Sequence, residues 1–426
     1  MNICIICPLS NSLPTYSIAS VIKAQCSLLS KFHHDVTVVV NENFSGTGFS
    51  GARLLKILPL TDLVDYSSKL SISKEHEAFA TNVAAILSPR LEQFDVVITH
   101  DLILTGWYMP FALSLMSMGE ENPEVPFFHF IHSDPTIQPP RDWWNFNHYM
   151  GNHTIVYPTA KPLIDISKVF NTNRVICIPH IIDPKHIYGF SEQTDDIVKL
   201  LPSIYSADIV QISCMATDRL DAKGARELIN LFGLLRRSGR SVCLIIANQF
   251  SGRREGRMVD PILYYEKVAR RCGLDPYTDF IFTSELFNGK YTDGLPQRVL
   301  FELMSLANLS VMTSKSESFG LGLIESMMSS AVICVANEHL SLPIKQYTSF
   351  DFKAFNETDQ QVDLKSLSGL VDWIIEQMES NSVIKARTII RQTLNPLAVY
   401  TTYYKPLFAT LPASSFSPIP PSYPEL

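Results

Sequence analysis

The stretch TSKSESFGLGLIESMMSSAVICVA, residues 313–336, decides the fold. An apolar run at 309–313 leads into a polar loop, a helical pattern begins near Gly320, and a second apolar run occupies 332–336. Continuous apolar strands separated by a helix are typical of a parallel sheet that is covered on both faces. The stretch therefore predicts one crossover unit of an α/β fold.

The loop and the helix of this stretch have the composition of a ligand site. Gly320 and Gly322 allow a ligand to approach backbone N–H groups, and a helix N-terminus offers unpaired donors that suit a diphosphate. Glu317 in the loop and Glu325 in the helix would flank this ligand and accept hydrogen bonds from the hydroxyl groups of a sugar and a ribose. The alternative is a loop with solvated acids before an ordinary core helix.

The same alternation of apolar runs and helical patterns extends along the chain in both directions. In the first half the expected strands are 3–7, 36–40, 54–58, 96–99, 127–131, 154–157 and 175–178. In the second half they are 209–213, 242–247, 280–283, 309–313 and 332–336. Right-handed crossovers then give an α/β protein with two Rossmann-like, doubly wound domains, which we expect to face each other across a cleft.

A polar break near the middle of the chain separates the two halves. We expect an N-terminal domain at 1–185, an interdomain linker at 186–206 and a C-terminal domain at 207–380. Residues 381–426 would contain a helix that returns toward the first domain, followed by a tail rich in Pro and Ser that has no fixed structure.

Composition excludes several classes of protein. The 426 residues carry a net charge of -7, which argues against general nucleic-acid binding but leaves room for a local basic groove. No apolar run approaches the length of a membrane span, and residues 1–12 lack the basic flank of a signal peptide. The eight cysteines fall mostly in apolar segments, so we expect free thiols and a cytoplasmic protein.

The stretch 313–336 resembles the retaining GT-B glycosyltransferases of the family 4 type. The pattern of that family is a strand, Pro-Ser, Glu, Phe-Gly and a second Glu eight positions after the first; the matching residues here are Thr313-Ser314, Glu317, Phe319-Gly320 and Glu325. The resemblance implies that Glu317 contacts hydroxyl groups of the donor sugar and that Glu325 binds the ribose of the nucleotide. It also implies that a donor-binding segment faces the sugar and phosphates, formed by Ser318, Phe319, Gly320 and Leu321.

A second segment, ISCMATDRLDAKGARELINLF at 212–232, resembles the strand, Arg-Leu, Lys-Gly and helix of the same family. Cleavage of a sugar–phosphate bond leaves a nucleoside diphosphate with growing negative charge. The resemblance implies that Arg219 and Lys223 stabilise this charge, each by roughly 3 kcal/mol if preorganised. The spacing between the two cations is one residue shorter than in the family, and the alternative is a solvated loop with ordinary surface charges.

The first half matches the family more loosely. RVICIPHIIDPKHIYGF at 174–190 resembles the segment Val-Ile-Pro-Asn-Gly-Val-Asp, with His180-Ile181 in place of Asn-Gly. His132 follows a strand where the family has a His, so the resemblance implies a catalytic role in which it hydrogen-bonds a donor hydroxyl or an acceptor group; the alternative is a satisfied core histidine. We expect His129 to point into the sheet, and His100 is an open case between structure and function. The glycine-rich turn usual after the first strand is absent.

Two further clusters are candidates for acceptor binding. Arg141, Trp143 and Trp144 would line an acceptor cleft by stacking on sugars or bases, or would form a hydrophobic plug that packs their loop onto the domain. The segment SGRREGR at 251–257 places three arginines on a loop, either facing an anionic ligand or solvated.

These observations predict a retaining glycosyltransferase, a hexosyltransferase, that moves a sugar from a UDP- or GDP-sugar to an acceptor. The N-terminal domain would bind the acceptor, which is a glycan, a lipid-linked molecule, a small molecule or a nucleic-acid base, and peripheral membrane contact is compatible with this. No Asp-x-Asp element lies at a strand end, so we expect no metal and no cofactor. The alternatives are a GT-B enzyme of viral type that glycosylates a nucleic-acid base, and a non-catalytic relative that binds a sugar nucleotide.

Overall fold

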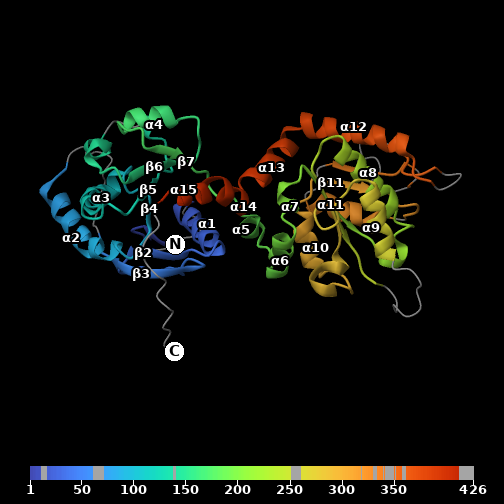
Figure 1. Ribbon diagram of the computed structural model, residues 1–426, viewed down its shortest axis with the longest axis horizontal. Coiled ribbons are helices and arrows are strands. Elements are labelled where there is room, and N and C mark those ends of the chain that lie inside the picture. Colours follow the sequence, from blue (N-terminus) through green and yellow to red (C-terminus); the bar gives the residue numbers. More distant parts are fainter. Residues whose placement is uncertain are drawn as a thin grey trace. The chain divides into compact units, whose positions relative to one another are not determined.

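The computed structural model describes residues 1–10, 17–60, 72–137, 141–250, 261–317, 319–329, 333–338, 340, 350, 352–356 and 361–411. The chain divides into two compact units (Figure 1). Unit 1 comprises Met1–Ile182 and Pro396–Leu426, and unit 2 comprises Asp183–Asn395.

Unit 1 is built on a parallel sheet of seven strands in the order β3-β2-β1-β4-β5-β6-β7. The strands are β1 (Asn2–Ile6), β2 (Asp35–Asn41), β3 (Ala52–Leu58), β4 (Val96–His100), β5 (Phe127–Phe130), β6 (His153–Tyr157) and β7 (Val175–Cys177). The order reverses between β1 and β4, which is the switch point of a doubly wound sheet. Ligands of such sheets bind beyond the carboxyl ends of the strands at this point.

Alternate residues of these strands feed two hydrophobic layers. Cys4 and Val97 contribute to one layer, with helices α2 (Lys74–Leu91) and α3 (Met109–Glu121). Ile5 contributes to the other, with α1 (Ser17–Lys31) and the C-terminal segment of α14 (Pro396–Val399), a π-helical turn (Tyr400–Tyr404) and α15 (Lys405–Ala409). Burial on both faces is why these strands are apolar throughout.

Unit 2 repeats the arrangement, and its described residues form five strands. They are β8 (Ile209–Cys214), β9 (Val242–Ala247), β10 (Phe280–Phe282), β11 (Leu309–Met312) and β12 (Ile333–Ala336). Backbone ladders join β10-β9-β8 and β11-β12. Between β8 and β11 an amide side chain takes the place of a ladder residue: Gln211 donates to the carbonyl of Val311 and accepts from its N–H, both at 3.0 Å. The combined order β10-β9-β8-β11-β12 has its switch point between β8 and β11.

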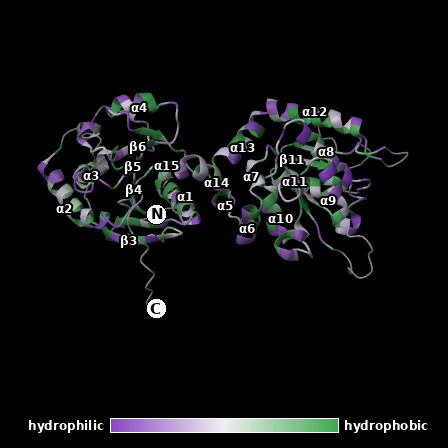
Figure 2. Cartoon of the chain, in the orientation of Figure 1, coloured by the Kyte–Doolittle hydropathy of each residue, from purple (hydrophilic) through white to green (hydrophobic). Residues whose placement is uncertain are grey.

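Helices cover both faces of the second sheet as well. One hydrophobic layer includes α8 (Ala225–Arg237), α9 (Pro261–Arg271) and α12 (Leu364–Ser380). The other includes α6 (Glu192–Leu200), α7 (Ser203–Ser206) and α10 (Gln297–Met304). Figure 2 shows hydrophobic strands inside each unit and hydrophilic outer faces on its helices. The predicted α/β class with two Rossmann-like units is confirmed.

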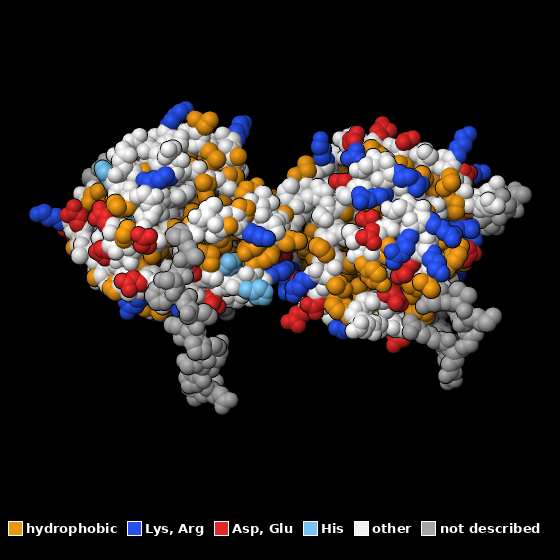
Figure 3. All heavy atoms as spheres, in the orientation of Figure 1, with side chains coloured by type: hydrophobic (Ala, Val, Ile, Leu, Met, Phe, Trp, Pro, Cys, Tyr) orange, Lys and Arg blue, Asp and Glu red, His pale blue; other side chains and the backbone are white. Residues whose placement is uncertain are grey.

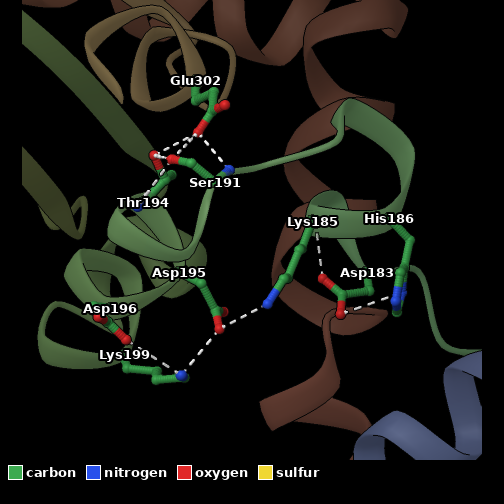
Figure 4. A network of polar contacts seen from close by, with 9 residues as sticks. All are labelled: Asp183, Lys185, His186, Ser191, Thr194, Asp195, Asp196, Lys199 and Glu302. Atoms are coloured by element: carbon green, nitrogen blue, oxygen red, sulfur yellow. Dashed lines mark hydrogen bonds and ion pairs between the residues drawn. The ribbon is translucent and has the colours of Figure 1, made fainter. Parts of the chain in front are cut away.

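The segment between the two predicted domains is helical and built into unit 2. After α5 (Pro184–Tyr188), Ser191 caps α6, and Glu302 of α10 accepts hydrogen bonds from the N–H and hydroxyl of Ser191, both at 2.8 Å, and from Thr194 at 2.6 Å (Figure 4). Burial alone would raise the pKa of Glu302, but the hydrogen bonds from Thr194, Ser191 and Arg298 lower it. This carboxylate therefore fixes α6 against α10 while ionised.

The surface is mixed in charge. On the face drawn in Figure 3, acidic and basic side chains are interspersed, with basic ones gathered over α9, where Lys267, Arg270 and Arg271 are exposed. Among the helices in the described part of the chain, none has the length and apolar character that a membrane span requires.

Candidate functional site

A pocket of about 240 Å³ lies beyond the carboxyl ends of β8 and β11, at the switch point of unit 2. Its walls come from the end of β8 (Ile212 to Met215), the end of β11 (Ser310 to Ser314) and the first turns of α11 (Leu321–Ser329). Lys223, Glu317 and Glu325 also line it. The position is the one at which doubly wound sheets bind ligands.

Lys223 and Glu317 form an ion pair inside this pocket. The ammonium Nζ donates to Oε2 of Glu317 at 2.5 Å, and the two side chains are only 22% and 17% exposed. The loops that carry them are joined by backbone contacts. The N–H of Lys315 donates to the carbonyl of Ala222 at 2.9 Å, and the hydroxyl of Thr313 donates to the carbonyl of Gly224 at 2.8 Å. The cation and the carboxylate are thus held together by the fold itself.

Gly224 is required at the start of α8. Its φ of +70° lies in the left-handed region, and a Cβ at this position would lie far inside contact distance of the carbonyl of Thr313. The close approach of these two backbones places Lys223 beside the end of β11. The Lys-Gly pair of the sequence therefore has a physical explanation: the glycine admits the approach that positions the lysine.

The start of α11 forms another wall. Gly320 precedes the helix with a φ of +75°, and the first helical hydrogen bonds run from Leu323 and Ile324 back to its carbonyl. The N–H groups of the first turn are therefore directed away from the helix, at its positive end. Gly322 lines the pocket, and a Cβ there would meet no heavy atom within 4 Å. This wall therefore leaves space in front of a helix N-terminus.

Glu325 adds a second carboxylate to the pocket. Desolvation, and then the negative charge of Glu325, raise the pKa of Cys214 to about 12, so the thiol at the end of β8 stays neutral. Among the residues that the structure describes, the pocket thus offers one cation, two carboxylates and a helix N-terminus. That set matches a ligand which carries both phosphate and hydroxyl groups.

Of the other residues predicted to contact the donor, only some line this pocket. Leu321 lines the pocket, whereas Phe319 is 52% exposed and Ser318 lies outside the described residues. The side chain of Arg219 is exposed and does not belong to the described lining of the pocket. Its carbonyl accepts a hydrogen bond from the N–H of Lys223 at 2.9 Å, so its backbone supports the loop.

His132 lies in unit 1, just after β5. Its Nε2 is 2.9 Å from Nδ1 of His100, its Nδ1 is 3.3 Å from Nε2 of His180, and its backbone N–H donates to Asp101 at 2.8 Å. Desolvation, and then the neighbouring His180, lower the pKa of His132 to about 3. The ring is therefore neutral, and both of its nitrogens are engaged by other histidines. His129 is fully buried in the sheet, as expected.

The aromatic residues considered for the acceptor belong to the core. Trp143 and Trp144 are fully buried in one hydrophobic layer of unit 1, and the indole N–H of Trp144 donates to the carbonyl of Leu104 at 2.9 Å. Their ring faces are therefore not available for stacking on a ligand, and the packing alternative applies to both. Arg141 lies 6.0 Å from the ring of Trp143, and the three arginines of 251–257 lie outside the described residues.

No metal centre is evident in the part of the chain that is described: no three His, Cys, Asp or Glu side chains are grouped there as a ligand set. The sequence interpretation missed two contacts of the histidines in unit 1: Nε2 of His100 lies 3.0 Å from Oε1 of Gln25, and Nδ1 of His132 lies 3.3 Å from Nε2 of His180. The one signal for His180 was its place in a motif that reads Asn in the family.

Comparisons with known proteins give structural neighbours only. No family model and no curated protein matches the sequence. A glycosyltransferase from Rickettsia africae ESF-5 overlaps at 10% identity with a TM-score of 0.35, covering 96% of this chain and 98% of its own. HepE of Anabaena, solved with UDP and glucose, overlaps at 11% identity and a TM-score of 0.34, covering 96% and 100%. A UDP-forming α,α-trehalose-phosphate synthase from Burkholderia xenovorans, solved with glucose-6-phosphate, overlaps at 13% identity and a TM-score of 0.37, again covering 96% and 100%.

Proposed function

We propose that this protein is a glycosyltransferase of the GT-B type that binds a nucleotide sugar in the pocket of unit 2 and transfers the sugar to an acceptor with retention of configuration. One observation carries the proposal: Lys223, Glu317, Glu325 and the N-terminus of α11 converge on one pocket at the switch point of a doubly wound sheet. The resemblance of 212–232 and 313–336 to family 4 enzymes supports it.

Different groups of the pocket would bind the diphosphate of such a donor and its hydroxyl groups. A diphosphate requires positive charge and N–H donors, which Lys223 and the first turn of α11 supply. In the reaction the bond between the sugar carbon and the phosphate oxygen breaks, and its electron pair stays on the nucleoside diphosphate. A preorganised cation at this oxygen stabilises the transition state by roughly 3 kcal/mol.

The carboxylates would bind hydroxyl groups. Glu317 accepts from Lys223 through Oε2, which leaves Oε1 for a hydroxyl of the donor sugar. Glu325, on the helix behind, would accept from the ribose. An entering diphosphate would share the ammonium of Lys223 with Glu317. The same ion pair therefore orients the sugar and neutralises the leaving group.

The finer features follow from the resemblance and are part of the proposal. They are a UDP- or GDP-hexose as donor, attack on the face from which the diphosphate departs, and catalysis without a metal, in which Lys223 supplies the charge that a divalent cation provides elsewhere. The resemblance also gives Arg219 this role, which would require its exposed side chain to turn toward the pocket. The acceptor is a hydroxyl compound of a class that we leave open. We place the enzyme in the cytoplasm on the ground of its free thiols.

A thermal-shift screen with UDP- and GDP-sugars, in buffer with EDTA, tests the donor site. A ligand at 100 times its Kd stabilises the folded protein by about 2.7 kcal/mol, which corresponds to about 5 °C or more for a unit of this size. The expected result is a shift with one nucleotide class that persists in EDTA. If no nucleotide sugar of the panel shifts the Tm, the proposal is contradicted. If the shift appears only when Mg²⁺ is added, catalysis without a metal is contradicted.

Turnover separates the two alternatives. NMR of the donor that binds, followed over hours, detects slow hydrolysis and reports the anomer released. Binding without any turnover, with or without acceptors, would identify a non-catalytic relative. Binding of duplex DNA that weakens steeply with salt would favour a nucleic-acid acceptor.

A further inference from the structure

One face of α9 in unit 2 carries positive charge and apolar side chains together. Leu263 and Tyr264, near the start of the helix, are 48% and 47% exposed, and the exposed Lys267, Arg270 and Arg271 follow them (Figure 3). At 3.6 residues per turn, these five side chains fall within about 120° of the helix circumference. They therefore form one continuous surface, which we call the α9 strip.

The opposite side of α9 holds the helix in the core of unit 2. Ile262, Tyr265 and Ala269 are buried in the hydrophobic layer that α9 shares with α8. The packing of the helix is thus complete without the α9 strip. Leucine and tyrosine side chains that remain exposed among cations, on a helix already packed on its other side, are compatible with a contact outside the chain.

The three cations of the α9 strip have no hydrogen-bond or ion-pair partner within the described part of the chain. On the neighbouring helix α8, by contrast, Arg236 is paired with Asp279 at 3.5 Å. The acidic residues nearest in the chain lie to the sides of the strip: Glu266 is half-buried at one margin, and Asp275 follows the helix. The positive charge of the strip is therefore available to an anionic partner.

An exposed tyrosine extends the α9 strip at its far end. Tyr277 is 55% exposed. Burial, and then the charges of Glu266 and Glu285, raise the pKa of Tyr277, whereas Arg270 lowers it, so the hydroxyl lies near the last turn of α9. The strip thus has an amphipathic ring at each end, with the cations between them.

This combination fits the surface of an anionic bilayer. Each Lys or Arg near such a surface strengthens binding about fivefold, a leucine enters the boundary of the acyl chains, and tyrosine rings prefer the level of the headgroups. A nucleic acid would use the cations and the rings but offers no apolar phase to Leu263. The net charge of -7 also opposes a partner that surrounds the protein, whereas a bilayer meets one face only.

The α9 strip begins at the edge of unit 2 that carries the donor pocket. The helix connects the parallel strands β9 and β10, so it starts at the carboxyl edge of the sheet and returns to the opposite edge. The turn Thr217–Arg219, which precedes Lys223 in the chain, packs against α9. Leu263 and Tyr264 therefore lie at the same edge as the pocket, within one compact unit.

We propose that unit 2 binds the surface of an anionic membrane through the α9 strip. Leu263 and Tyr264 enter the headgroup region, and the three cations pair with acidic headgroups. The contact is peripheral and reversible, because it combines a small apolar area with electrostatic attraction. It goes beyond the proposed function and does not depend on it, since the strip lies outside the described lining of the donor pocket.

Co-sedimentation of the full chain with vesicles tests the contact. Vesicles of phosphatidylcholine with about one third phosphatidylglycerol should bind the protein at least about tenfold more tightly than vesicles of phosphatidylcholine alone. Rising salt should weaken this binding, because it screens the headgroup charge. Equal binding to both kinds of vesicle, or no binding to the anionic ones, would overturn the inference.

Two pairs of charge reversals locate the contact. Lys267→Glu with Arg271→Glu should weaken binding to the anionic vesicles about 25-fold or more, because two attractions of about fivefold each are lost. Lys365→Glu with Lys385→Glu changes the net charge by the same amount at exposed positions of α12 and α13 (Ser382–Thr393). This control pair should leave binding within about a factor of two. An equal loss in both pairs would show a response to total charge and would refute the assignment to α9.

Leu263→Ser distinguishes a membrane from a nucleic acid. Its effect on vesicle binding should be a loss of about fivefold, since half of the leucine surface is free to enter the bilayer. The Tm and the donor-induced shift in Tm should stay close to the wild-type values, because the side chain is exposed. Tighter binding to an oligonucleotide than to vesicles, unchanged in Leu263→Ser, would overturn the inference. A negative donor screen would leave vesicle binding as it is, so the two proposals fail separately.

Discussion

Nζ of Lys223 lies 2.5 Å from Oε2 of Glu317, although 94 residues separate the two in the chain. The contact depends on the close approach of Gly224 to the end of β11 and on the backbone hydrogen bond between Lys315 and Ala222. Neither loop could hold its charged group in this position alone. The pair therefore links the two segments that the sequence comparison selected independently, and it lies in the pocket that carries the proposed function.

Lys223→Ala should abolish transfer and leave the fold intact. The variant removes the one cation among the described residues that line the pocket, and a loss of roughly 3 kcal/mol of transition-state stabilisation lowers kcat/KM by a factor of about 100 or more. The variant leaves the carboxylate of Glu317, which is only 17% exposed, without its ionic partner, so the free energy of unfolding should fall by roughly 1–3 kcal/mol. Donor turnover and urea unfolding measure the two quantities.

The matched control for this variant is Lys365→Ala, which removes an exposed lysine of the same unit from α12. It should leave both turnover and stability at the wild-type level. Turnover retained in Lys223→Ala would refute the assignment of the leaving-group cation.

Gly322→Leu should block the donor without weakening the fold. A side chain at this position starts in open space, and leucine has a higher helix propensity than glycine by about 1 kcal/mol. We expect equal or higher stability together with loss of the donor-induced shift in Tm, because the new side chain would occupy the pocket that Gly322 lines.

Gly369→Leu is the control, since Gly369 is also helical, exposed and free of neighbours, but belongs to α12. It should stabilise the protein and leave donor binding unchanged. Normal donor binding in Gly322→Leu would mean that the ligand does not reach the first turn of α11.

Gly224→Ala should lower the free energy of unfolding of unit 2 by more than the cost of a left-handed φ for alanine. A left-handed φ costs a residue other than glycine about 1–2 kcal/mol, and here a Cβ would also overlap the carbonyl of Thr313. Gly239 has a φ of +89° with no neighbour within 4 Å, so Gly239→Ala measures the cost of conformation alone. The difference between the two unfolding free energies isolates the overlap, and equal values would show that the two loops are not held in close approach.

Much of the fold could be predicted because buried parallel strands have a plain sequence pattern. The strand expected at 242–247 coincides with β9. The bridge that Gln211 makes between β8 and β11 could not be predicted, since a buried amide has no local signature that distinguishes this use from any other.

The candidate site was predictable to the extent that its residues are close in sequence to strand ends. Lys223 and Glu317 follow β8 and β11, neighbouring strands whose carboxyl ends meet at one edge, so their grouping follows from topology. The burial of Trp143 depends on how a loop packs, which periodicity does not encode. The link from His132 to His180 joins residues that follow two strands of unit 1 separated by β6, and only the structure shows it.

Acidification should destabilise unit 1 by titrating histidines that are buried in the neutral form. Desolvation lowers the pKa of His132 and of His153 to about 3, aided by His180 and by Arg174 respectively. Desolvation also lowers the pKa of His100 and of His129 well below the ordinary value. In the unfolded chain these groups titrate near 6.5, so below this pH the unfolded state binds more protons and the free energy of unfolding falls with decreasing pH.

The slope for each buried histidine approaches about 1.4 kcal/mol per pH unit below pH 6.5 and vanishes above it. Burial raises the pKa of Asp101 to about 6, so protonation of this carboxyl stabilises the folded state as the pH falls from 6 to 4. The effect of this single carboxyl is smaller than the combined loss of stability from the four imidazoles. Unit 1 should therefore lose several kcal/mol between pH 7 and pH 5.5.

Fluorescence of a Trp373→Phe variant would report on unit 1 alone, because the other three tryptophans, Trp107, Trp143 and Trp144, belong to it. Urea unfolding of this variant at pH 8, 7, 6 and 5.5 should give equal free energies at the two higher values and a steep fall below them. His148→Gln, at an exposed position, should leave the fall unchanged, whereas His129→Asn should reduce its slope by about one proton. A free energy that is constant down to pH 5.5 would mean that these rings accept protons in the folded state, and the prediction would then be wrong.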